Sequence, residues 1–118
     1  MTVIVIVMVT LRASLAQVSL GSSFGTDKLS KQLNQAARVI SARGALSAER
    51  DVFHVRLGGF DTHTDVGDVM QTKLSEVDAA LSSFVGEMRA QGLWGSVTIL
   101  LASEFGRTIT SNGQGTDQ

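Results

Sequence analysis

Two short polar segments carry the side chains best suited to hold a metal ion or an anion. Asp61 and His63 stand one residue apart, directly after the Gly58-Gly59 pair, so a carboxylate oxygen and an imidazole nitrogen can face a common point. Oxygen and nitrogen ligands together suit zinc, iron or manganese better than calcium. The alternative is an ordinary polar loop, in which Asp61 caps the following turn and His63 is solvated.

A second polar segment follows the apolar run at residues 97–102. Glu104 stands where a further carboxylate could complete or flank a metal site, and Arg107 could hold a phosphate or sulfate oxygen by paired hydrogen bonds. The alternative is an ion pair between these two residues, because they are three positions apart. Nothing in the sequence identifies an activated nucleophile.

The surrounding pattern predicts the elements that position these residues. Helical periodicity covers residues 27–43 and 68–91, and short runs of strand formers cover residues 52–57 and 97–102. Strand, helix and strand with short connections predict a βαβ unit with adjacent parallel strands. Both polar segments then share the edge of the sheet at which ligands bind in parallel sheets. We therefore expect Asp61, His63 and Glu104 to lie close together.

Composition limits the classes of partner. The chain has 118 residues, is 43% hydrophobic and has a formal net charge of −1, so a single unit with its own core is expected and a nucleic-acid partner is not. It contains no Cys, which excludes disulfides and thiolate metal sites and leaves the cellular compartment open. The absence of Pro and Tyr and the polar C-terminal end suggest a fragment.

The N-terminal apolar run, Val3 to Val9, has two interpretations. It reads as a buried strand because it consists of β-branched residues and Met. The following Ser14-Leu15-Ala16 could instead mark the cleavage site of a signal peptide, although no Lys or Arg precedes the run. Seven residues are far short of the roughly 20 that span a bilayer, so no membrane span is expected.

Five blocks of sequence resemble one bacterial family, the domain of unknown function 1501. In chain order they are LGGFDTH at 57–63, GLWGSV at 92–97, SEFGRT at 103–108, NG at 112–113 and GTD at 115–117. The resemblance covers about residues 20–117. We therefore divide the chain into an apolar strand or signal-like segment at residues 1–20 and a family-matching region at 21–118, within one partial domain.

That family is similar to the alkaline phosphatase and sulfatase superfamily. The resemblance implies an α/β fold, a parallel βαβ-based three-layer sandwich that is only partly present. It also implies a divalent metal such as zinc or manganese, with Asp61, His63, Glu104 and Asp117 as ligands and Arg107 as a catalytic anion-binding residue. Phe105 stands where related enzymes place a His, and Gln118 stands where the family has another His, so two expected ligands are missing.

The resulting hypothesis is a fragment of a metal-dependent phosphatase or sulfatase-like hydrolase, inactive alone, whose parent acts on an anionic ester. The nucleophile is expected upstream of this chain. The alternative is a non-catalytic binding or assembly protein that retains the fold. In either case the unpaired sheet edges of a partial domain predict that the fragment associates with itself.

Overall fold

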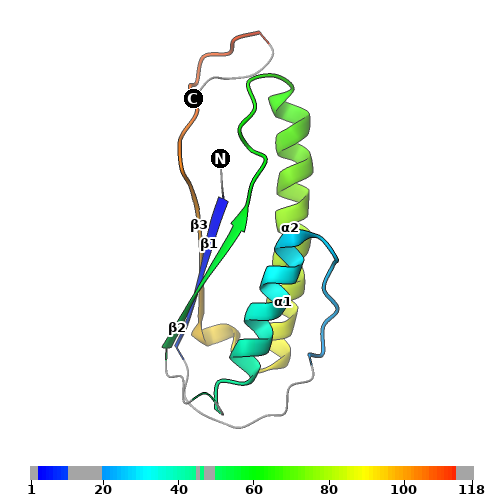
Figure 1. Cartoon of the computed structure of the whole chain (residues 1–118), viewed down its shortest axis with the longest axis vertical. Coiled ribbons are helices and arrows are strands. Elements are labelled where there is room, and N and C mark those ends of the chain that lie inside the picture. Colours follow the sequence, from blue (N-terminus) through cyan, green and yellow to red (C-terminus); the bar gives the residue numbers. More distant parts are fainter. Residues whose placement is uncertain (1–2, 11–19, 45, 47–49, 114–118) are drawn as a thin grey trace.

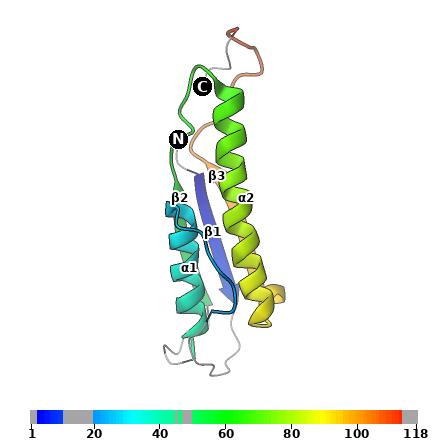
Figure 2. The same ribbon diagram turned by 90° about the vertical axis from the view of Figure 1, so that its right-hand side faces the viewer.

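The computed structural model describes residues 3–10, 20–44, 46 and 50–113, which form a three-stranded sheet and two long helices. The strands are β1 (Val3–Thr10), β2 (Arg50–Leu57) and β3 (Val97–Ser103), and the helices are α1 (Lys28–Ser41) and α2 (Val66–Ala90), with a short 3-10 helix η1 (Trp94–Ser96) before β3. Both helices lie on the same side of the sheet, so the described residues form two layers (Figures 1 and 2). The predicted α/β class and the strand at the N-terminal apolar run are confirmed.

The ends of both helices follow from local chemistry. Asp27 caps α1, and its side chain accepts a hydrogen bond from the Ser30 backbone N–H at 2.9 Å. Helix α2 ends in a Schellman motif, in which Gly92 adopts φ 71° and the Leu93 N–H donates to the Met88 carbonyl at 2.8 Å. The prediction that this helix stops at Gly92 is confirmed.

The sheet order corrects one prediction. The order is β2-β1-β3, with β1 antiparallel to both neighbours. Strands β2 and β3 therefore run in the same direction, as predicted, but they are not adjacent, and the pairs in this sheet are antiparallel. Consecutive strands are neighbours in only about two-thirds of cases, so a helical connection alone could not exclude an intervening strand. The C-terminal ends of β2 and β3 still lie at one edge of the sheet (Figure 1).

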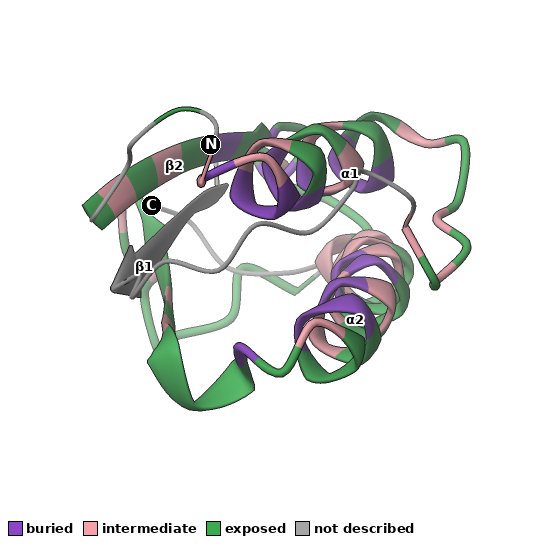
Figure 3. Cartoon of the chain, turned by 90° about the horizontal axis from the view of Figure 1, so that it is seen from below, coloured by how far each residue is buried: buried purple, intermediate pink, exposed green. Residues whose placement is uncertain are grey.

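The core lies between the helix pair and one face of the sheet. Its largest fully buried apolar side chains are Phe60, Phe84, Leu29, Leu33, Ile40 and Met88. Figure 3 shows the buried stretches of α1 and α2 on the sides that face each other. On the opposite face of the sheet, Val52 and Leu100 are 64% and 53% exposed, so no described element covers that face.

A side chain joins α1 to the outer edge of β2. The Gln32 amide donates to the Arg56 carbonyl at 2.8 Å and accepts from the Arg56 N–H at 3.0 Å. The two bonds satisfy backbone groups that an edge strand otherwise leaves open. Among the described helices, none is long and apolar enough to cross a membrane.

Candidate functional site

The segment after β2 begins with a buried anchor and a constrained glycine. Phe60 is 1% exposed and fixes the start of the loop in the core. Gly59 adopts φ 92°, and a Cβ at this position would lie 2.8 Å from Cε of Lys73 in α2. The chain therefore turns at Gly59 with little room for a side chain, and the residues after Phe60 lie at the sheet edge.

Asp61 and His63 face each other at this edge. The distance between Nε2 of His63 and Oδ1 of Asp61 is 3.7 Å, and their side chains are 61% and 58% exposed. Two ligands of one tetrahedral zinc ion lie about 3.4 Å apart, given bonds of about 2.0–2.2 Å. The donor types and their spacing therefore fit a shared metal ion. They also fit a solvated ion pair with a protonated His, which contributes little to stability.

Glu104 does not join this pair. It is exposed, and the ion pairs between described residues, His63–Asp61 and Lys73–Glu76, do not include it. Within the described residues, no group of three or more His, Asp or Glu side chains could hold a metal ion. In the sheet, the intervening β1 separates β2 from β3 by about 9.6 Å, which is twice the usual strand spacing.

Asp117, the fourth predicted ligand, lies outside the described residues. The roles of Glu104 and Asp117 as ligands thus stay predictions. Asp65 and Asp68 occupy the N-terminal end of α2, as expected for residues that favour the positive end of the helix dipole.

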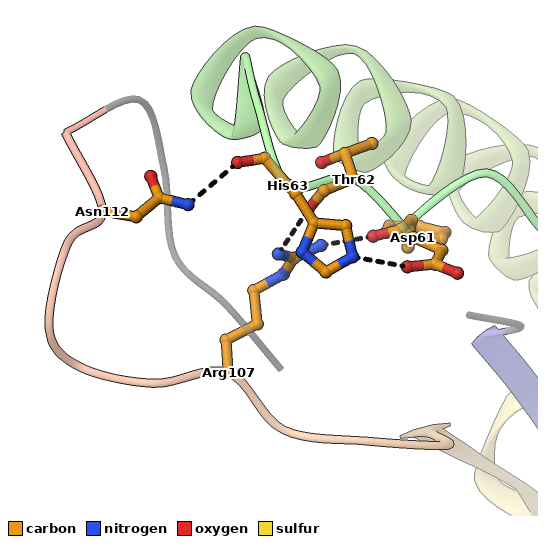
Figure 4. Close-up of polar contacts among 6 residues, drawn as sticks. Asp61, Thr62, His63, Arg107 and Asn112 are labelled. Carbon is orange, nitrogen blue, oxygen red and sulfur yellow. Dashed lines mark hydrogen bonds and ion pairs between the residues drawn. The ribbon is translucent and has the colours of Figure 1, made fainter.

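Arg107 reaches across from the segment after β3 to the segment after β2 (Figure 4). Its Nη1 donates to the Thr62 carbonyl at 2.7 Å, and its Nη2 donates to the Phe60 carbonyl. Asn112 donates from Nδ2 to the His63 carbonyl at 3.1 Å. The two segments are therefore joined by side-chain donors from one and backbone acceptors from the other.

The sequence does not predict these contacts. It predicts that Arg107 binds an anion, a role that stays a prediction, and it marks Asn112 only as part of an Asn-Gly pair. The partners of both are backbone carbonyls, which every residue type supplies, so no pattern of side chains could have indicated them.

An apolar cavity of about 390 Å³ adjoins the site between α2 and β3. Its lining includes Phe60, Met70, Leu74, Leu101 and Phe105, and Arg107 is its single charged lining residue among those described. Such a surface does not suit a phosphate or sulfate group, which needs several hydrogen-bond donors.

Comparison with known proteins identifies the family. The sequence profile described as "Protein of unknown function (DUF1501)" matches residues 7–118. The chain belongs to this family. The match starts upstream of the predicted limit near residue 20, so the second half of β1, residues 7–10, belongs to the family region as well. No curated protein and no solved structure matched the chain.

Proposed function

We propose that this chain supplies part of the metal centre of a hydrolase that acts on phosphate or sulfate esters. The observation that carries the proposal is the Asp61–His63 pair, with an oxygen and a nitrogen donor 3.7 Å apart at the sheet edge where the segments after β2 and β3 meet. The resemblance of the family to the alkaline phosphatase and sulfatase superfamily supplies the reaction class. A bound divalent cation would stabilise negative charge that develops on the ester oxygens.

Asp61 and His63 are the residues that would hold the cation in this chain. Both are exposed, so a cation can reach them without opening the core. Two protein ligands bind a metal weakly, because catalytic zinc sites use three. Further ligands, with Glu104 and Asp117 as the candidates in this chain, are needed for a tight site. The isolated chain is accordingly proposed to bind metal weakly and to hydrolyse nothing.

Oxidation driven by a bound metal tests the ligand pair directly. Ferrous iron with ascorbate and peroxide oxidises side chains next to the ion, and the chain contains two His, so His54 serves as an internal control. Both His residues are exposed. Mass spectrometry should find His63 oxidised in preference to His54, and excess zinc or manganese should suppress this preference by competition.

Matched variants make the result specific. Asp61→Asn should abolish the preference for His63, whereas Asp78→Asn, the same change at an exposed position of α2, should leave it intact. Glu104→Gln reports whether Glu104 is a further ligand. Equal oxidation of His54 and His63 in the unmodified chain would refute the proposed pair.

The proposed hydrolase activity has to be tested with a longer member of the family. A chromogenic phosphate ester and a sulfate ester should be hydrolysed in a metal-dependent way, and replacing the Asp and His that align with Asp61 and His63 should remove the activity. A longer protein that retains metal but leaves both esters intact would favour the non-catalytic binding or assembly role.

A further inference from the structure

The loop that carries the candidate ligands has little regular structure of its own. Residues 58–64 connect β2 to α2. Within this loop, the described residues form one backbone hydrogen bond, from the Thr62 N–H to the Phe60 carbonyl at 3.1 Å. Neither a helix nor a strand therefore fixes the directions of Asp61 and His63. Their placement has to come from contacts with other parts of the chain.

Three side-chain donors from the segment after β3 meet this loop. Arg107 binds the carbonyls of Phe60 and Thr62, the two residues that flank Asp61. Asn112 binds the carbonyl of His63. The three accepting carbonyls thus lie at or next to the two candidate ligands, and Figure 4 shows the Arg107 side chain pointing toward the loop that carries them.

The planar guanidinium suits this task. It presents several N–H groups in a fixed fork, so two carbonyls two residues apart are held at a set separation. Hydrogen bonds from a charged donor are also stronger than neutral ones. An ammonium at the same position would keep the charge but lose the fork.

We propose that Arg107 and Asn112 are positioning residues, which hold the backbone of residues 60–63 so that Asp61 and His63 face each other. The consequence for metal binding rests on the proposed function, whereas the consequence for the loop does not. The assignment differs from direct anion binding by Arg107, in which the guanidinium would act on the substrate and the loop would keep its order without it.

Backbone relaxation of the metal-free chain by NMR tests the assignment. In the unmodified chain, residues 60–63 should have order parameters near those of rigid backbone, about 0.85, and Arg107→Ala should lower them toward the flexible range, below about 0.6. Arg107→Lys should give an intermediate value. Asn112→Ala should loosen His63 alone, and Arg89→Ala, an equal charge change at the end of α2, should leave the loop unchanged.

A second measurement separates the two proposals. If Arg107→Ala loosens the loop and also abolishes the preferential oxidation of His63, both stand. If the loop loosens but His63 was never preferred in the unmodified chain, the positioning role stands and the metal site fails. Unchanged loop order in both Arg107→Ala and Arg107→Lys would overturn the positioning role, most clearly if added inorganic phosphate shifts the Arg107 signals. Where Arg107→Ala does not fold, Arg107→Lys and Asn112→Ala decide the question.

Discussion

Substitution of Gly59 tests how the chain turns into the loop that carries the candidate ligands Asp61 and His63. The φ of Gly59, 92°, lies in the region that side chains avoid, and an added Cβ would lie 2.8 Å from Cε and 3.1 Å from Nζ of Lys73. Gly59→Ala therefore combines backbone strain with a steric overlap. Gly67→Ala in α2 is the matched control, because a Cβ there has no heavy atom within 4 Å and the backbone does not require glycine.

The two substitutions should act in opposite directions. A left-handed conformation costs a residue other than glycine about 1–2 kcal/mol, and the reduced entropy of the unfolded chain returns about 0.4–1 kcal/mol. The overlap with Lys73 adds little, because the end of a long side chain can move, and its half-buried ion pair with Glu76 at 3.5 Å contributes less than about 1 kcal/mol. We expect Gly59→Ala to lower the free energy of unfolding by about 1 kcal/mol, and Gly67→Ala to raise it by about 0.5 kcal/mol.

Urea titrations followed by circular dichroism measure these changes, with a stabilising osmolyte present to keep a marginal fold in range. The double variant Gly59→Ala/Lys73→Ala separates the two causes. If strain dominates, removing Lys73 recovers little of the loss, and if overlap dominates, it recovers most. A Gly59→Ala chain that is as stable as the unmodified chain would refute the reasoning, because neither strain nor overlap would then constrain this turn.

Two further predictions concern the fold. Asp27→Ala should lower the free energy of unfolding by about 1 kcal/mol through loss of the α1 cap. Burial alone would raise the pKa of Asp27, but hydrogen bonds from Ser30 and neighbouring backbone N–H groups outweigh it and lower the pKa below its ordinary value of 3.8. The cap should therefore stabilise fully above that value and be lost as the pH falls through the lowered pKa, so acid titrations of unmodified and Asp27→Ala chains should converge. The isolated chain should also self-associate in size-exclusion chromatography and show no ester turnover. Leu100→Lys on the open sheet face should shift it toward monomer, whereas Ser82→Lys on α2 should not. A monodisperse unmodified chain with turnover that Asp61→Ala abolishes would contradict the prediction.

The elements could be predicted because each follows a local rule. The helical period placed α1 and α2 within a few residues of their observed ends, and the β-branched runs placed all three strands. The strand order could not be predicted in the same way, because it depends on pairing between segments far apart in the chain. Glu87 illustrates a second limit, since it is buried in α2 and accepts a hydrogen bond from the Ser22 N–H at 2.8 Å. A charged residue on a helix is normally exposed, and its distant partner is a backbone group.

The same distinction between local features and contacts of distant segments applies to the candidate site. Asp61 and His63 are one residue apart, so their proximity followed from the sequence. The partners of Arg107 are 45 and 47 residues away and that of Asn112 is 49 residues away. Since all three partners are carbonyls, residue types could predict neither the contacts nor the role they suggest.

The position of β1 sets the separation of the strands that precede the two polar segments. With β1 between them, β2 and β3 are about 9.6 Å apart in the hydrogen-bonding direction. Glu104, the first residue after β3, is exposed and forms no ion pair with another described residue. The side chain of Arg107 connects the segment after β3 to the segment after β2, and it ends on the backbone that flanks Asp61. In this arrangement, the side chain that connects the two segments is the one that we propose as the positioning residue for Asp61 and His63.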